Sequence, residues 1–224
     1  IRSYSLEKGK ATYLTKWTKL FAPAVSPDGK YIAAVTSNEA YSHFLTILDA
    51  ETGNLVDSLS LPGNPMILTP NWSENGKKIV AITVGDKGKA IVSVDFPGMK
   101  AEYLTEPEFT EIYDPAFYGD FVLFSGSYNG KADIYAVDTK EGGILQVTSV
   151  SYGAYKPVVS PSGKKLAFAN YTADGYRLAV MDMDKALLSR VSLEREHSLN
   201  LYRVFENEQD FVFQSQNVPQ KEYE

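Results

Sequence analysis

Four aspartates recur at one position of a repeated pattern, and they are the carboxylates of this sequence whose spacing best suits chemistry. Carboxylates repeated at one phase around an axis could surround a metal ion or a substrate. Each of them, however, follows an apolar run and precedes a turn, where an aspartate side chain accepts hydrogen bonds from nearby backbone N–H groups. A residue present in every repeat usually serves the repeat. We therefore predict a local structural role for this set, which comprises Asp49, Asp95, Asp138 and Asp182.

The other reactive residue types give little support for catalysis. The two histidines, His43 and His197, have no second ligand at a metal-binding spacing such as H-x-x-x-H. Gly126-Ser127-Tyr128 lacks the glycine that a G-x-S-x-G nucleophile turn needs two residues after its serine. The sequence has no cysteine, no G-x-G-x-x-G signature and no D-x-D-x-D-G calcium loop. We predict no catalytic residue, no metal ligand and no cofactor.

Aromatic residues give one lead toward binding. Tyr and Phe are enriched at recognition surfaces, and the connections between strands carry many binding residues. The alternative is that these rings pack between structural units. Eight aromatic residues fall in or beside predicted connections: Tyr41, Phe44, Tyr113, Tyr128, Tyr152, Tyr155, Tyr171 and Tyr176. All of these except Tyr155 are our candidate binding residues.

These residues are positioned by a repeat that covers most of the chain. The stretch 23–32, Pro-Ala-Val-Ser-Pro-Asp-Gly-Lys-Tyr-Ile, returns in related form at 70–79 and 157–166, with a shortened copy at 115–122. The first prolines of these copies recur at intervals of 47, 45 and 42 residues, a period typical of stacked supersecondary units. Each copy predicts an extended segment, a tight turn built on glycine and a β-type run. The predicted runs are 31–36, 78–84, 121–125 and 165–170.

Two further strands complete each period. One ends at the recurring aspartate, and nine or ten residues later comes an aliphatic residue followed by a hydroxyl residue. These pairs are Leu59-Ser60, Leu104-Thr105, Val147-Thr148 and Val191-Ser192. In the last period the segment from Met183 to Arg190 has helical composition, and we interpret it as a variant connection.

Four short strands in forty-odd residues are typical of a propeller blade. We therefore predict an all-β fold, a single β-propeller domain over 1–224. Its parts are a half-blade at 1–20, blades at 21–66, 67–111, 112–153 and 154–196, and a half-blade at 197–224. The two half-blades are complementary, and their pairing would close a five-bladed ring without open sheet edges. The alternative, a segment of a larger propeller, stays open.

Composition excludes several classes of partner. The formal net charge of −6 argues against nucleic acid, which requires clustered Lys and Arg. No run approaches the roughly 18 apolar residues of a membrane span, so we predict no membrane insertion. Because the chain starts at Ile1 without an initiator methionine or a leader, we expect a mature chain or an excised segment.

The repeat carries a family resemblance. The order Pro-x-x-Ser-Pro-Asp-Gly-Lys-x-Ile, an apolar strand ending in Asp, a Gly turn and Leu-Thr resembles the WD40-like (PD40) repeat of TolB-type propellers. The match is strong at 23–60 and 157–192, good at 70–105 and weaker at 115–148, where the turn loses two residues. The Gly-His and Trp-Asp signatures of true WD40 repeats are absent. The resemblance implies a propeller with a central channel and a periplasmic or other cell-envelope location in bacteria.

The resemblance does not imply one function, because such propellers occur in several settings. We predict a non-catalytic module that binds a protein or peptide, as part of a larger protein. One alternative is a propeller that is appended to a hydrolase or peptidase and controls access of its substrates. A second is a carbohydrate-binding or carbohydrate-active propeller, which the scarcity of histidine disfavours.

Overall fold

The computed structural model describes residues 1–16, 18–183 and 189–190. The chain divides into two compact units, Ile1–Leu193 and Glu194–Glu224, and all described residues belong to the first. The described residues form β-strands and turns, without a helix, so the predicted all-β class is confirmed. None of them forms a helix with the length and hydrophobicity that a membrane crossing requires.

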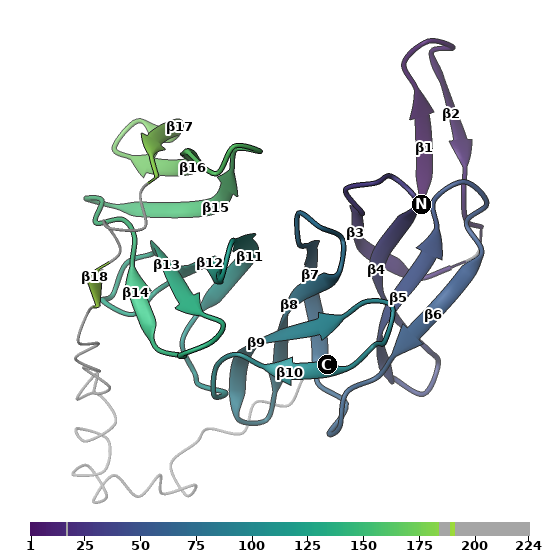
Figure 1. The fold of residues 1–224 in the computed structure, drawn as a ribbon, viewed down its shortest axis with the longest axis horizontal. Helices are drawn as coiled ribbons and strands as arrows, with labels where there is room; N and C mark the ends of the chain where they lie inside the picture. The colour runs from purple at the N-terminus through teal and green to yellow at the C-terminus, as the bar shows by residue number, and fades with distance from the viewer. Residues whose placement is uncertain (17, 184–188, 191–224) are drawn as a thin grey trace, which may run out of the picture. The chain divides into compact units, whose positions relative to one another are not determined.

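Within each sheet, strands that follow one another in the chain pair antiparallel and form a meander (Figure 1). A two-stranded sheet comes first, with β1 (Arg2–Ser5) and β2 (Lys10–Tyr13). The first four-stranded sheet contains β3 (Leu20–Val25), β4 (Tyr31–Ser37), β5 (His43–Asp49) and β6 (Leu55–Leu59). The second contains β7 (Met66–Trp72), β8 (Lys78–Gly85), β9 (Gly88–Asp95) and β10 (Ala101–Tyr103).

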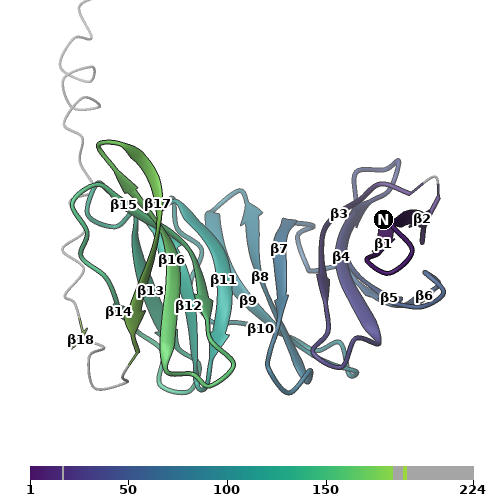
Figure 2. The ribbon, with the colours of Figure 1, turned by 90° about the horizontal axis from the view of Figure 1, so that it is seen from above.

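Two more sheets follow. From here on, the sheets that begin with β3, β7, β11 and β15 are called the first, second, third and fourth sheets. The third contains β11 (Ile112–Tyr118), β12 (Phe121–Gly126), β13 (Asp133–Asp138) and β14 (Ile144–Gln146). The fourth contains β15 (Gly153–Val159), β16 (Lys165–Thr172) and β17 (Gly175–Asp182), drawn in green in Figure 2. A two-residue strand, β18 (Ser189–Arg190), pairs with β14 of the third sheet.

The template turn is held by the same hydrogen bonds in three copies. In the first, the Ser26 hydroxyl accepts from the Tyr31 N–H at 2.9 Å and donates to the Asp28 carboxylate at 2.7 Å, while the Gly29 N–H donates to the Ser26 carbonyl. Gly29 has a φ of 73°, a conformation that glycine adopts without steric cost. Ser73 and Ser160 repeat the arrangement in the second and fourth sheets, with Asn75 and Ser162 in the place of Asp28. The template therefore predicts a hairpin from local chemistry.

The observed strands agree with the repeat pattern. The four predicted β-type runs are β4, β8, β12 and β16, and β5, β9, β13 and β17 each end at the recurring aspartate. The last period differs, because Ser189–Arg190 adds to the edge of β14 and does not pair with β17. The hydroxyl pair 191–192, the segment 184–188 and the half-blade at 197–224 lie outside the described residues. Ring closure and the blade boundaries therefore stay predictions.

Neighbouring sheets pack on one another through three apolar clusters. Successive side chains of a strand point to opposite faces, so β8 sends Ile79 into a cluster shared with the first sheet and Val80 into a cluster shared with the third. Likewise β12 sends Leu123 toward the fourth sheet and Val122 toward the second. Inner strands that are buried on both faces read as continuous apolar runs, which explains the sequence Ile-Val-Ala-Ile-Thr-Val in β8.

The first strand of each sheet lies beside the first strand of the next, in the order β3, β7, β11, β15. Each of these strands has a β-bulge, seen as a shift of register against its partner strand. At every bulge, the residue before the template proline has a left-handed backbone with φ between 45° and 54°, which is uncommon for residues with a side chain. These four residues, which we call the bulge residues, are Ala22, Thr69, Asp114 and Lys156.

Candidate functional site

A pocket of about 620 Å³ lies where the third and fourth sheets meet, and two bulge residues line it. A volume of this size is within the range of ligand-binding pockets. We call it the tyrosine pocket, because three of its eight lining residues are tyrosines. The lining residues are Glu111, Tyr113, Asp114, Ser127, Tyr155, Lys156, Ala169 and Tyr176.

Strand register places the rings of the fourth sheet. Tyr155 of β15 lies directly opposite Ala169 of β16, and Tyr171 of β16 lies opposite Tyr176 of β17. Opposed residues of antiparallel strands share a face, so the small Ala169 leaves room between larger rings. The ring centroids of Tyr155 and Tyr176 are 6.0 Å apart, and those of Tyr171 and Tyr176 are 5.0 Å apart. The result is a row of three rings, of which Tyr155 and Tyr176 line the pocket.

A glycine makes room for the Tyr155 ring. A Cβ atom on Gly153 would lie 2.8 Å from the ring carbon Cε2 of Tyr155 and 3.0 Å from its hydroxyl oxygen. Gly153 and Tyr155 are two residues apart on β15 and therefore lie on the same face of the strand. Gly153 thus helps to fix where this wall of the pocket stands.

Two lining residues from the side of the third sheet, Glu111 and Tyr113, belong to a charged cluster with Lys89, which does not itself line the pocket. The Lys89 ammonium contacts the Glu111 carboxylate at 2.5 Å and lies 4.3 Å from the ring centroid of Tyr113. The Tyr113 hydroxyl donates a hydrogen bond to the same carboxylate. Lys89 first, and Tyr113 second, hold the pKa of Glu111 below its usual range. The hydrogen bond to Glu111 raises the pKa of Tyr113 to about 12. At neutral pH the pocket is therefore lined here by a neutral phenol and by a carboxylate that is paired with Lys89.

Asp114 is the carboxylate without such a partner. Its side chain is partly buried, and burial raises the pKa of the carboxyl, while the charge of Lys156 partly offsets that rise. Within residues 1–16, 18–183 and 189–190 it accepts no hydrogen bond. A carboxylate that is removed from water and not fully compensated is costly, so it favours a ligand that supplies a donor or a positive charge.

The predicted aromatic residues divide between this pocket and other places. Tyr113 and Tyr176 line the pocket, and Tyr171 contacts Tyr176. Tyr128 packs edge-to-face on Tyr135, with centroids 4.8 Å apart, and so takes part in the apolar core. Phe44 lines a different pocket, beside the first sheet. Tyr41 and Tyr152 are exposed and do not line the tyrosine pocket.

Two of the repeated aspartates accept backbone N–H groups, as the sequence predicts, and the other two form ion pairs across the strands. The Asp49 carboxylate accepts from the Thr52 N–H at 2.7 Å, and the Asp138 carboxylate accepts from the Lys140 N–H at 2.8 Å. Asp95 and Asp182 form ion pairs at 2.9 Å with the lysines opposite them, Lys78 and Lys165. The hydroxyls of Thr105 and Thr148 likewise accept backbone N–H groups, from Ile91 and Ile134.

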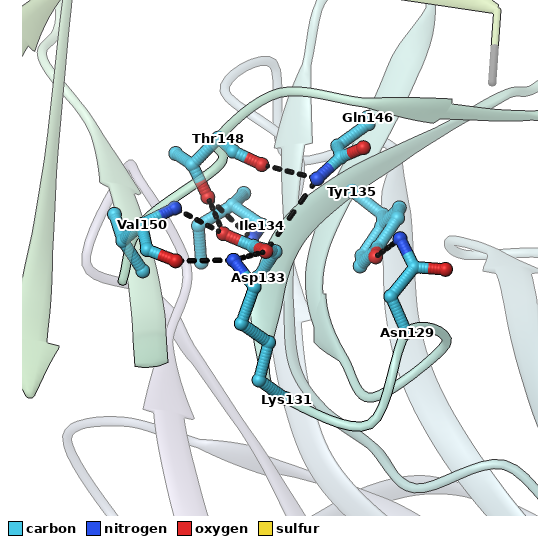
Figure 3. A network of polar contacts seen from close by, with 8 residues as sticks. All are labelled: Asn129, Lys131, Asp133, Ile134, Tyr135, Gln146, Thr148 and Val150. Carbon is cyan, nitrogen blue, oxygen red and sulfur yellow. Dashed lines mark hydrogen bonds and ion pairs between the residues drawn. The ribbon is translucent and has the colours of Figure 1, made fainter. Parts of the chain in front are cut away.

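A second polar cluster surrounds Asp133, whose side chain is fully buried (Figure 3). Its carboxylate accepts from the Thr148 hydroxyl at 2.9 Å and the Val150 N–H at 3.0 Å, and it pairs with the Lys131 ammonium at 2.9 Å. Gln146 approaches at 3.5 Å and donates to the Thr148 carbonyl at 2.7 Å. Because both carboxylate oxygens have partners, we interpret this cluster as a structural tie between β13 and the connection that leads to β15.

Neither cluster has the composition of a metal centre or a nucleophile site. Among the described residues, no three His, Asp or Glu side chains come together as metal ligands would. Ser127 lines the tyrosine pocket, but no histidine lines it with Ser127. His43 lies at the start of β5, where its backbone N–H donates to Asn64, and His197 lies outside the described residues.

Residues 9–199 match the family model described as the TolB beta propeller domain (PD40). The chain belongs to this family. In agreement with that membership, TolB-type propellers are among the solved structures that share its fold. TolB from Acinetobacter baumannii superposes with a TM-score of 0.64 at 22% identity, over 84% of this chain and 47% of that one. A putative TolB from Agrobacterium tumefaciens gives 0.63 at 26% identity, over 75% and 64%. The chain thus spans less than two thirds of either protein.

Relatives of other descriptions are also found for this TolB-type propeller. An uncharacterized protein of Agrobacterium fabrum is 25% identical over 82% of this chain and 80% of its own length. An acylaminoacyl peptidase shares the fold, with a TM-score of 0.57 at 16% identity, over 84% of this chain and 34% of that one. At such an identity the likeness concerns the fold alone.

In this TolB-type propeller the sequence alone missed the charged half of the pocket. Asp114 and Lys156 were not among the candidates, although each directly precedes a template proline. The signal that could have found them is this position in the repeat, because it brings residues from neighbouring first strands together. The finished pocket offers flat rings, a neutral phenol and a partly buried carboxylate. Rings of this kind stack on flat groups, and a carboxylate pairs with cations and hydrogen-bond donors.

Proposed function

We propose that the chain is a non-catalytic propeller module that binds a protein or peptide partner in the tyrosine pocket. The observation that carries the proposal is a pocket of about 620 Å³ that combines tyrosine rings with charged groups from two sheets. Tyrosine is favoured in recognition surfaces because its ring gives a large contact area at a small entropic cost and its hydroxyl can form hydrogen bonds. The pocket also lies at strained bulges, and backbone strain is concentrated at functional sites.

The family supports a cell-envelope setting for this binding. The chain belongs to the TolB propeller family, and the TolB proteins that it resembles come from bacteria. We therefore propose that the partner is met in the periplasm, and that the module acts within a larger protein. The control of access to a peptidase domain is the alternative from sequence, and it has only the shared fold as support.

Peptide display tests the proposal. A random-peptide library is selected on the protein, and the enriched peptides are measured by fluorescence anisotropy on variants. We expect Tyr155→Ala with Tyr176→Ala to abolish binding, because the row of rings is lost. Tyr103→Ala is the matched control, since Tyr103 is an exposed tyrosine on the outer strand β10. The proposal is wrong if no peptide is enriched, or if the enriched peptides bind the double variant as well as the wild type.

A further inference from the structure

The tyrosine pocket places a partly buried carboxylate together with three tyrosines. Asp114 is a partly buried carboxylate that accepts no hydrogen bond within the described residues, and it stands at a left-handed φ of 51°. Tyr113, one residue before Asp114, and the rings of Tyr155 and Tyr176 line the same space. The faces of aromatic rings attract cations, and a carboxylate adds a full opposite charge.

We propose that this pocket binds an arginine side chain of the peptide partner, with its guanidinium stacked against the tyrosine rings and hydrogen-bonded to Asp114. This inference rests on the proposed function and specifies its ligand. The flat guanidinium presents several N–H donors in one plane and matches a carboxylate in two parallel hydrogen bonds. It also stacks on aromatic faces and is more weakly hydrated than an ammonium, so it enters a partly buried site at a lower desolvation cost.

The charge of the whole chain acts in the same direction. The formal net charge of −6 draws basic partners toward the protein and repels acidic ones. The second carboxylate of the pocket, Glu111, is already paired with Lys89 and bonded by Tyr113. Asp114 is therefore the carboxylate that is left to meet a guanidinium from outside.

Lys156 is an internal competitor for that role. Lys156 lines the same pocket, and its charge lowers the pKa of Asp114. It forms no close ion pair with Asp114 in the described structure, and its side chain is exposed. Removal of this charge should therefore strengthen the binding of a cationic ligand. A residue that merely supported the fold would not give this gain.

The test uses three blocked tripeptides as probes: acetyl-Gly-Arg-Gly-amide, its lysine analogue and its citrulline analogue. Citrulline has nearly the shape of arginine but no charge. Binding is followed by the chemical shifts of ¹³C-labelled tyrosine rings in the full chain. We expect the arginine peptide to shift the signals of Tyr113, Tyr155 and Tyr176 and to bind about tenfold more tightly than the citrulline peptide. The lysine peptide should fall between the two.

Two substitutions assign the effect to the pocket. Asp114→Asn should weaken binding of the arginine peptide about tenfold. Asn tolerates the left-handed backbone at least as well as Asp, so this variant should keep its fold. Lys156→Gln should tighten the same binding severalfold, because it removes a competing charge. A gain of affinity cannot come from misfolding.

The outcomes separate this inference from the proposed function. If display yields peptides that need the tyrosine rings but bind Asp114→Asn and Lys156→Gln unchanged, the arginine assignment is wrong and the peptide-binding function stands. Equal binding of the arginine and citrulline tripeptides would also overturn it. If no probe shifts the pocket tyrosines and display enriches nothing, both proposals fail.

Discussion

Among the residues that the structure describes, Asp133 is the fully buried carboxylate. Because it has several partners, we expect its replacement to destabilise the fold. Asp133→Ala deletes the acceptor of Thr148 and of the Val150 N–H, and it takes the counter-charge from Lys131. We expect the free energy of unfolding to fall by about 3 kcal/mol, since buried donors lose a charged acceptor. Urea denaturation at neutral pH measures this loss.

The matched control is Asp182→Ala. Asp182 pairs with Lys165 at the same 2.9 Å, but its side chain is 88% exposed. Exposed ion pairs contribute little to stability because water and salt screen them. Equal losses for the two variants would contradict the structural role that we assign to the buried cluster.

The ionisation of Tyr113 is a second prediction at the scale of single residues. The neutral phenol donates to the Glu111 carboxylate, whereas a phenolate would be repelled by it, so the pKa of Tyr113 is raised to about 12. The stabilisation is present below the ordinary tyrosine pKa of about 10 and is lost as the pH rises through 12. Glu111→Gln should bring the pKa of Tyr113 back toward about 10.

Titration of ¹³C-labelled tyrosine by NMR tests this shift. Tyr135 is the internal control, because burial is the first cause that raises its pKa to about 12 and Glu111 is not among the causes. Glu111→Gln should leave Tyr135 unchanged. A Tyr113 pKa that stays near 12 in this variant would show that the hydrogen bond is not its cause.

At the scale of the elements, the bulge in the first strand of each sheet leads to a prediction about stability. Ala22 has a φ of 47°, and a left-handed backbone costs a residue with a Cβ about 1–2 kcal/mol. Ala22→Gly relieves this strain but makes the unfolded chain more flexible, so we expect a net gain of about 0.5–1 kcal/mol in unfolding free energy. Thermal or urea denaturation measures it.

Ala33→Gly in the regular strand β4 is the control, and we expect it to change the unfolding free energy in the opposite direction. Ala33 is fully buried in the cluster between the first and second sheets, and glycine in the interior of a strand is destabilising. We expect Ala33→Gly to lower the unfolding free energy while Ala22→Gly raises it. Losses in both variants would mean that the bulge at Ala22 is not strained.

At the scale of the whole molecule, the packing of each sheet on its neighbours predicts that a cavity in one cluster destabilises mainly the sheets that form that cluster. Ile79→Ala opens a cavity in the cluster between the first two sheets and should cost about 2–4 kcal/mol. In repeated architectures each unit contacts mainly its neighbours. Hydrogen exchange should therefore accelerate most in β3–β10 and least in β15–β17.

Leu166→Ala is the reciprocal variant, because Leu166 is buried between the third and fourth sheets. It should accelerate exchange in β11–β17 and spare β3–β6. The same exchange pattern for both variants would show that the sheets unfold as one cooperative block.

Much of the fold was predictable because its signals are local. In three of the four templates the serine, the glycine and the apolar run lie within about ten residues of one another, and the shortened copy keeps the glycine and the run. The hairpins and the strands ending at Asp49, Asp95, Asp138 and Asp182 therefore follow from short-range chemistry. Two features are not local. The pairing of β18 with β14 depends on competition between sheet edges, and Tyr128 enters the core because it packs on Tyr135.

The tyrosine pocket is the least predictable part. Asp114 and Lys156 are far apart in the sequence and meet because β11 and β15 are neighbours. Whether Tyr155 and Tyr176 face the same space depends on strand register, which the pattern of residue types does not specify at the ends of strands. Aromatic composition pointed to the region, and the geometry selected which rings belong to it.

The bulge before each template proline requires a left-handed backbone, but it does not require one type of side chain. Four copies share one backbone geometry, yet they carry a methyl group, a hydroxyl, a carboxylate and an ammonium in Ala22, Thr69, Asp114 and Lys156. A single substitution at this position therefore changes the chemical group that the bulge presents and leaves the backbone geometry as it is. The bulge stays the same in all four copies while the side chain that it presents differs from copy to copy.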